Sequence, residues 1–264
     1  ITLLILALAR PQTNMNRQDI SVEGIDIMLA TDISSTMLAE DVKPNRIEAA
    51  KDVAIDFINS RPDDRIGLVV FSGESFTQCP LTSNHAMLIN LFKDINFGMI
   101  DDGTAIGDGL ATAINRLKES KARSKVIILL TDGINNMGSI DPQSAAEMAE
   151  LYGIRIYTIG VGTMGTALFP VRTQYGLQYQ RMEVQIDEAL LKKISALTNG
   201  KYFRATNRQK LQEVYKEIDR LEKSKIDVTE FNRKKEEFMP FLIFALLLLT
   251  LEFVFRFAVL KLVP

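Results

Sequence analysis

Five oxygen-bearing side chains follow predicted strands or begin a predicted helix at three separate places in the chain. Asp32, Ser34 and Thr36 are spaced two residues apart after the first strand, so an extended or turning segment can direct all three to one point. Thr104 lies at the start of a predicted helix, and Asp132 follows another predicted strand. Because ligands bind at the carboxyl ends of parallel strands, we expect these oxygens to converge at one sheet edge.

This set combines carboxylates and hydroxyls with no thiolate or imidazole. Such oxygen donors suit Mg²⁺, Mn²⁺ or Ca²⁺ rather than zinc or copper, and Mg²⁺ is the best-suited ion. Because only two of the donors carry a formal charge, we expect modest affinity and room for a further anionic ligand. Each residue also has a structural explanation, since Ser and Thr form turns and caps and Asp132-Gly133 is a common turn. The combination is what indicates a cation site.

The composition excludes several other classes of site. The 264 residues contain 31 Lys and Arg against 33 Asp and Glu, a formal charge of −2, whereas nucleic-acid-binding domains are usually strongly basic. One Cys and one His exclude an intrachain disulfide framework and make a His-based zinc site or catalytic dyad unexpected. We expect Cys79 to be a structural thiol and His85 to be a surface residue at the start of a helix.

Residues 24–222 alternate between strand and helix patterns, which predicts an α/β fold. The strands are almost continuously apolar, as expected for a doubly wound, mainly parallel sheet with helices on both faces. The predicted strands are 25–31, 66–71, 126–130, 154–161 and 202–203, and the predicted helices are 45–61, 82–92, 104–117, 143–152, 187–197 and 209–221.

Residues 164–185 break this alternation, and their Gly, Pro and Tyr content predicts an inserted loop or hairpin. The glycines from Gly160 to Gly165 match the dinucleotide-binding pattern G-x-G-x-x-G. That fingerprint requires a helix directly afterwards, and the segment containing Pro170 does not predict one. We therefore interpret the glycines as turn residues at the start of the insertion.

Both ends of the sequence are strongly apolar. Residues 241–263 are apolar except for Thr250, Glu252, Arg256 and Lys261, and as a helix they would span about 35 Å against a hydrocarbon core of roughly 30 Å. We predict a transmembrane or interfacial helix at 239–264, with a buried core helix as the alternative. We interpret residues 1–10 as the end of a truncated transmembrane helix, or else as an apolar strand or propeptide remnant. The predicted linkers are 11–23 and the charged segment 223–238.

Residues 24–222 resemble a von Willebrand factor A (VWA) domain. That family carries a metal-ion-dependent adhesion site with the pattern Asp-x-Ser-x-Ser, followed later by a Thr and then an Asp. Here the first element runs from Asp32 through Ser34 to Thr36, and Thr36 replaces the second Ser while retaining the hydroxyl. Thr104 and Asp132 match the other two elements. The resemblance implies that these five residues hold a divalent cation.

The resemblance extends to the Bat (bacterial aerotolerance) branch of the family. It implies a protein anchored in the bacterial cytoplasmic membrane, in which an acidic residue of a protein partner completes the metal coordination. It also implies a MoxR-type AAA+ ATPase and related VWA proteins as partners in envelope stress tolerance, with no small-molecule substrate. Basic residues do not decide which side of the membrane carries the domain. The similar stretches are 37–46, 64–71, 76–82 and 200–205.

Two other functions are compatible with parts of the sequence. A structural membrane scaffold with an empty metal site would need the same fold. Magnesium-dependent phosphoryl transfer also uses an aspartate after a first strand, but haloacid-dehalogenase-type enzymes need a second acid two residues later, where Ser34 stands. A hydrolase with Ser34 as nucleophile lacks a base, because His85 lies in a separate polar segment. A non-enzymatic binding module therefore remains the preferred hypothesis.

Overall fold

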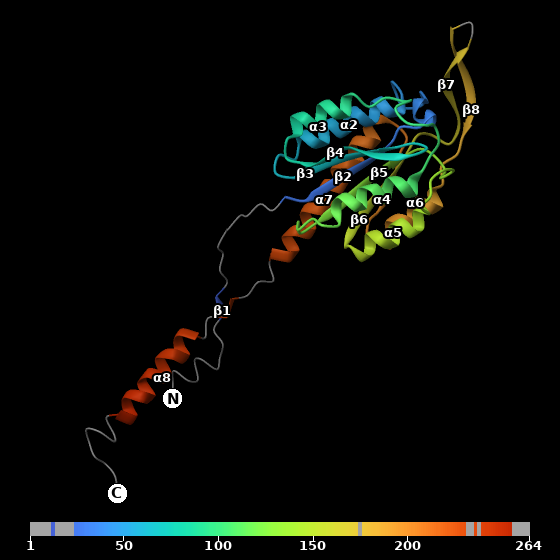
Figure 1. Ribbon diagram of the computed structural model, residues 1–264. Coiled ribbons are helices and arrows are strands. Elements are labelled where there is room, and N and C mark those ends of the chain that lie inside the picture. The colour runs from blue at the N-terminus through green and yellow to red at the C-terminus, as the bar shows by residue number, and fades with distance from the viewer. Residues whose placement is uncertain (1–11, 14–23, 174–175, 231–234, 237–238, 255–264) are drawn as a thin grey trace. The chain divides into compact units, whose positions relative to one another are not determined.

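The computed structural model describes residues 12–13, 24–173, 176–230, 235–236 and 239–254 (Figure 1). The chain divides into two units, Val22–Ile226 and a smaller one composed of Ile1–Ser21 and Asp227–Pro264. The larger unit contains all the candidate site residues.

The larger unit is built around a six-stranded sheet with the order β4-β3-β2-β5-β6-β9. All neighbouring strands are parallel except β3 and β4, so the predicted mainly parallel sheet is confirmed. The strand β4 is not predicted from the sequence, because polar residues and Pro80 interrupt its pattern, as is typical of an edge strand. The strands are β2 (Asp26–Asp32), β3 (Arg65–Phe71), β4 (Ser75–Thr82), β5 (Lys125–Thr131), β6 (Ile154–Val161) and β9 (Tyr202–Ala205).

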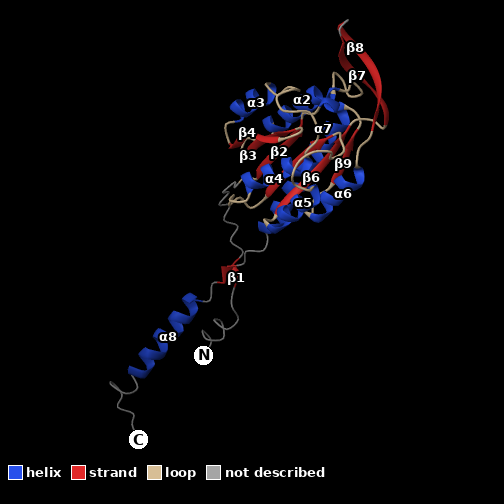
Figure 2. Ribbon diagram, turned by 45° about the vertical axis from the view of Figure 1, so that its right-hand side comes forward, coloured by secondary structure: helices blue, strands red, loops and turns tan. Residues whose placement is uncertain are grey.

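Helices cover both faces of this sheet (Figure 2). Successive side chains of β2 point to opposite faces: Ile27 and Leu29 pack with α2, α3 and α7, whereas Met28 and Ala30 pack with α4, α5 and α6. The central strands are therefore buried on both sides, which explains their nearly continuous apolar sequences. The helices are α2 (Arg46–Asn59), α3 (His85–Lys93), α4 (Ile106–Leu117), α5 (Pro142–Leu151), α6 (Glu188–Leu197) and α7 (Arg208–Glu230).

All six predicted helices are found, but most of their boundaries differ from the predicted ones by one residue or more. The helix α4 begins at Ile106, so Thr104 lies in the preceding loop and not at the helix start. The helix α7 continues to Glu230, past the predicted end at residue 221. The cap of α3 is Asn84, whose side chain accepts the backbone N–H of Met87, so the helix begins after the predicted start at residue 82.

The structure shows the environments of His85, which was predicted to lie on the surface, and of Cys79, which was predicted to be a structural thiol. His85 is the first residue of α3, as predicted, but it is half-buried, and its Nε2 lies 2.9 Å from the carbonyl oxygen of Asp64. Cys79 is fully buried in β4, and this burial raises the pKa of its thiol. A buried thiol that resists ionisation is a poor nucleophile.

The insertion is a hairpin of β7 (Gly165–Thr173) and β8 (Gly176–Val184), which pair antiparallel as a separate two-stranded sheet (Figure 1). The strand β7 begins at Gly165, and no helix follows the glycines that start at Gly160. The requirement of the dinucleotide fingerprint for a helix is therefore not met.

The smaller unit contains the strands β1 (Gln12–Thr13) and β10 (Lys235–Glu236), which pair antiparallel, and the helix α8 (Met239–Val254). No helix within the described residues combines the length and apolar character needed to cross a bilayer. The predicted membrane helices on either side of the domain are therefore not supported by this part of the chain. Residues 1–10, and residues 255–264 of the predicted C-terminal helix, lie outside the described residues.

We expect Leu129→Ala to destabilise the fold strongly, because Leu129 is fully buried in the central strand β5. Large-to-small substitutions at such sites cost about 2–5 kcal/mol in unfolding free energy. Urea unfolding followed by circular dichroism measures this loss. Leu151→Ala is the matched control, because Leu151 is 85% exposed and its truncation should change little. Equal effects of the two substitutions would contradict the assigned core.

Candidate metal centre

The sheet brings the ends of β2 and β5 side by side. The two strands are parallel neighbours, with Thr31 opposite Leu130, so Asp32 and Asp132 follow at the same carboxyl edge. Both aspartates are almost completely buried, at 0% and 1% exposure. Asp32 and Asp132 are far apart in the sequence, and the pairing of β2 with β5 brings them to the same edge of the sheet.

A chain of hydrogen bonds connects three of the predicted site residues. The Thr36 hydroxyl donates to Oδ1 of Asp132 at 2.6 Å. The hydroxyl oxygens of Ser34 and Thr36 lie 2.8 Å apart. Because Thr36 uses its single proton toward Asp132, Ser34 must donate to Thr36. The oxygens of both hydroxyls therefore retain lone pairs for a cation.

Hydrogen bonds from Ser34 and Thr131 hold the carboxylate of Asp32 in place. Its Oδ1 accepts the backbone N–H of Ser34 at 2.9 Å, and its Oδ2 accepts the Thr131 hydroxyl at 2.6 Å. Thr131 in turn accepts the backbone N–H of Gly133 at 3.2 Å. These contacts fix the carboxylate of Asp32 against the loop that carries Asp132.

Thr104 lies next to this group without joining its hydrogen bonds in the described part of the chain. Its backbone N–H donates to Oδ1 of Asn136 at 2.9 Å, which holds the loop in place. A Cβ added at Gly133 would lie 3.1 Å from the Thr104 hydroxyl oxygen. The hydroxyl is therefore adjacent to the residue that follows Asp132, and all five predicted residues lie in one region.

The structure places a buried arginine beside Asp132, and this residue was not among the predicted site residues. The guanidinium of Arg46 is fully buried, and its Nη1 donates to Oδ2 of Asp132 at 2.6 Å. Its Nε and Nη2 donate to the two carboxylate oxygens of Asp41, both at 2.7 Å. One signal was available: Arg46 shares a helical face with the buried Ala50 and Val53, four and seven residues later. A charge on an apolar face indicates a buried ion pair.

Asp41 extends the network to the base of the hairpin. Its Oδ2 also accepts the backbone N–H of Thr163 at 2.7 Å and the Thr163 hydroxyl at 3.0 Å. Gly162 has a positive φ of 114°, and a Cβ there would lie 2.5 Å from Cζ of Arg46. The glycine at this position therefore provides the space that the guanidinium occupies.

Burial and charge shift the pKa values of all three aspartates. Burial, followed by the nearby charge of Asp132, raises the pKa of Asp32 to about 7. Burial also raises the pKa of Asp132, although Arg46 and Thr36 offset part of the effect. Burial alone would raise the pKa of Asp41, but hydrogen bonds from Arg46 and Thr163 lower it to about 2. A nearby divalent cation would favour the ionised form of both buried carboxylates.

The oxygen geometry fits a small hard cation. Adjacent ligands of an octahedral Mg²⁺ with metal–oxygen distances of 2.0–2.1 Å lie about 2.9 Å apart. The hydroxyl oxygens of Ser34 and Thr36 are separated by 2.8 Å and could occupy two adjacent positions. The described residues contain no group of three or more Asp, Glu, His or Cys side chains suited to a metal. Hydroxyls, water and an external ligand would therefore have to supply most of the coordination.

A sequence profile of the von Willebrand factor type A domain matches residues 26–217. The chain belongs to this family. A UPF0353 protein of Mycolicibacterium paratuberculosis is 32% identical over 232 residues, which cover 83% of this chain and 66% of that protein. The chain thus spans just under two thirds of the length of this relative.

Two solved structures confirm the predicted resemblance to the Bat branch. BatB, a conserved hypothetical protein of Bacteroides thetaiotaomicron, is 30% identical with a TM-score of 0.66, covering 76% of this chain and 100% of that one. An aerotolerance-related membrane protein of Bacteroides fragilis is also 30% identical, with a TM-score of 0.65 and coverages of 75% and 98%.

A more distant VWA structure holds a metal. Proximal thread matrix protein 1 of the mussel byssus was solved with a zinc-occupied metal-ion-dependent adhesion site. It is 25% identical with a TM-score of 0.58, and the match covers 75% of this chain and 45% of that protein.

We expect Asp32→Asn to stabilise the metal-free protein at pH 8. Because the pKa of Asp32 is raised from 3.8 to about 7, the folded state binds more protons than the unfolded state between these values. Stability is therefore lost as the pH rises from about 4 to 7 and stays low above it. The neutral Asn removes this loss, which is on the order of 4 kcal/mol at pH 8. Urea unfolding in EDTA at pH 5 and pH 8 measures it. An equal pH dependence in both proteins would contradict the prediction.

We expect Arg46→Met to destabilise the protein by about 3–5 kcal/mol, because it leaves Asp41 and Asp132 without their buried cation. Adding Asp41→Asn should recover part of the lost stability, because it removes one of the two carboxylates that Arg46→Met leaves unpaired. Arg208→Met serves as the control. Arg208 pairs with Asp52 at the surface, where both side chains are about half exposed, and exposed pairs contribute 0–1 kcal/mol. A small loss of stability in both variants would show that the buried ion pairs do not contribute about 3–5 kcal/mol.

Proposed function

We propose that the chain is a protein-interaction module that holds a divalent cation at Asp32, Ser34, Thr36, Thr104 and Asp132. Mg²⁺ is the best-suited ion, and Mn²⁺ and Ca²⁺ are also compatible with oxygen ligands. An acidic residue of a protein partner completes the coordination. In this proposal the centre binds a partner and does not catalyse a reaction, because its two buried aspartates, Asp32 and Asp132, both serve as cation ligands.

One observation carries this proposal. The hydroxyl oxygens of Ser34 and Thr36 have free lone pairs and lie at the distance expected for two adjacent octahedral ligands. Thr36 contacts the buried carboxylate of Asp132, and the buried carboxylate of Asp32 lies beside them. Burial makes both carboxylates unfavourable without a compensating charge, and Arg46 compensates only Asp132 directly. A divalent cation would supply the missing charge. The zinc-occupied site of the byssus protein supports the same use of this edge of the fold.

The proposal includes anchoring in the bacterial cytoplasmic membrane. The described part of α8 exposes large apolar side chains at consecutive positions, among them Ile243 at 59%, Phe244 at 60% and Leu246 at 64%. Apolar exposure over most of the surface of a helix is unfavourable in water and suits a lipid or a protein environment. The likeness to an aerotolerance-related membrane protein supports the membrane as that environment.

The resemblance to the Bat branch supports a partner class as well as a location. It implies that the module acts with a MoxR-type AAA+ ATPase and with related VWA proteins in envelope stress tolerance. Pull-down of the purified ATPase by the membrane-embedded chain, in Mg²⁺ and in EDTA, tests this partnership. Binding that is unaffected by EDTA would contradict the role of the cation.

One observation favours a second candidate, a structural scaffold that works without metal. Arg46 already pairs with Asp132, so the fold has a resident positive charge at the site. This reading predicts that divalent cations neither bind to nor stabilise the protein.

We expect the full chain in detergent to bind one Mg²⁺ or Mn²⁺ by calorimetry, and Asp32→Ala to weaken binding by at least about tenfold, the loss already typical of outer-shell substitutions at metal sites. Asp52→Ala is the matched control, because Asp52 is half-exposed on α2 and pairs only at the surface. Thr36→Ser keeps the hydroxyl without the methyl group and should bind at least as tightly as the native chain. Equal binding by the Asp32→Ala and native chains would refute the site, and no binding at all would favour the scaffold.

A further inference from the structure

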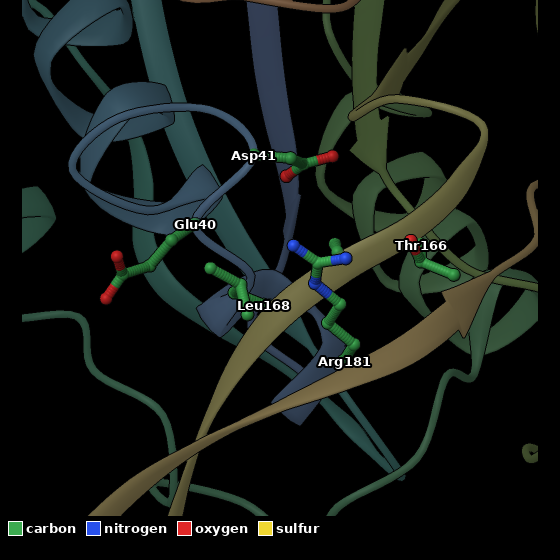
Figure 3. A pocket seen from close by; sticks show the side chains of 6 residues that line it. Glu40, Asp41, Thr166, Leu168 and Arg181 are labelled. Carbon is green, nitrogen blue, oxygen red and sulfur yellow. The ribbon is translucent and has the colours of Figure 1, made fainter.

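The larger unit carries charge at two places outside the candidate metal centre. A cavity of about 350 Å³ lies at the base of the β7–β8 hairpin, and its charged lining residues are Glu40, Asp41 and Arg181 (Figure 3). Acids and an arginine together do not select the charge of an occupant. The segment 118–125, which connects α4 to β5, differs because it contains four Lys or Arg residues and a single acid, Glu119.

Two serines fix this segment to buried carboxylates. The hydroxyl of Ser120 donates to Oδ2 of Asp26, and the hydroxyl of Ser124 donates to Oε2 of Glu222 at 2.8 Å. Both acids are only 1% exposed. The backbone N–H of Asp26 also donates to the carbonyl oxygen of Ser124 at 3.1 Å. The segment is therefore held against the start of β2 and against α7.

The basic side chains of the segment lie on its outer side. Each buried acid beneath the segment has an arginine of its own, since Asp26 pairs with Arg65 and Glu222 pairs with Arg155. These acids therefore do not offset the charge of the segment itself. Its exposed basic residues are Lys118, Lys121 and Arg123. The result is a fixed surface with an excess of positive charge.

Two exposed apolar side chains lie beside this basic surface. Lys125 is opposite Ile154 in the sheet, and its Nζ donates to the carbonyl oxygen of Tyr152. Tyr152 is 46% exposed, and Leu151, at 85%, is the most exposed large apolar residue in the described part of the chain. Basic side chains next to exposed apolar ones are typical of surfaces that bind anionic membranes.

The larger unit begins and ends close to this surface in the sequence. Val22, its first residue, precedes Asp26 by four positions, and Ile226, its last residue, follows Glu222 by four. The residues beyond both limits belong to the smaller unit, which contains the apolar helix α8. The chain thus passes from this edge of the sheet to the helix that is proposed to contact lipid. This continuity favours a lipid surface over another polyanion.

We propose that segment 118–125, together with Leu151 and Tyr152, docks the larger unit on an anionic lipid surface. This inference rests on the membrane anchoring in the proposed function. The basic side chains contact lipid phosphates, and the two apolar side chains enter the interfacial region. Asp26 and Asp32 lie at opposite ends of β2, so docking at the Asp26 end leaves the candidate metal centre accessible to a protein partner.

The full chain in nanodiscs tests this surface. Glu119→Cys receives a single fluorescent dye, because the native Cys79 is fully buried. The discs consist of phosphatidylcholine alone, or of equal parts phosphatidylcholine and phosphatidylglycerol, and both contain a nitroxide lipid that quenches a nearby dye. All measurements are made in EDTA, so that the candidate metal centre does not contribute. We expect quenching in the acidic discs only, and its loss at high salt.

Reversing two charges, by Lys118→Glu with Lys121→Glu, should lower the ratio of docked to undocked chains at least about 25-fold, since each basic residue near an anionic surface contributes about fivefold. Leu151→Ser should also lower this ratio, with an unchanged circular dichroism spectrum. Lys93→Glu with Lys216→Glu is the matched control, because these exposed lysines on α3 and α7 change the net charge equally.

The outcomes separate docking from anchoring. A chain that stays with both kinds of disc but is quenched equally in both, or is unaffected by the reversal at 118 and 121, contradicts docking and leaves anchoring in place. An equal loss in the control pair also contradicts the assigned surface. Retention and quenching by acidic discs alone support docking and contradict anchoring. Retention by neither kind of disc overturns both.

Discussion

The fully buried guanidinium of Arg46 is the interaction on which the arrangement of the site depends. It donates to carboxylates on two loops, Asp41 and Asp132, and Asp41 in turn holds Thr163 at the start of the hairpin. Removing a charged group from water is costly unless partners satisfy it, so these loops are held in one relative position. The planar fork of arginine suits this task, because one group forms parallel bonds to Asp41 and still reaches Asp132.

The same charges would limit the affinity of the proposed site for a cation. Arg46 supplies one positive charge to Asp132, whereas Asp32 has only hydroxyl and backbone donors, and its pKa rises to about 7. Without metal, the charge of Arg46 therefore offsets part of the negative charge at the site. The ionisation of both Asp32 and Asp132 is still unfavourable. A divalent cation and a partner's acid would together complete the charge balance that the protein leaves open.

The hairpin gives the site a second wall that the six-stranded sheet does not supply. It is anchored where the backbone of Glu40 meets Leu168, a few residues after Ser34 and Thr36. The segment that follows the two hydroxyl-bearing residues therefore also contacts the hairpin. Specificity for a partner could arise on this wall without any change to the oxygens that are proposed to hold the cation.

The sequence by itself determined the alternation of strands and helices and the five oxygen-bearing residues, because periodicity and side-chain type are local properties. It did not predict β4, whose polar edge pattern resembles a loop, or the choice of a hairpin for residues 164–185. Only the tertiary structure decided that Arg46 donates a hydrogen bond to Asp132, because these residues are 86 positions apart and the order of the strands brings them together. It likewise placed Arg181 over a cavity beside Asp41, because pairing between distant elements depends on packing, which no local pattern records.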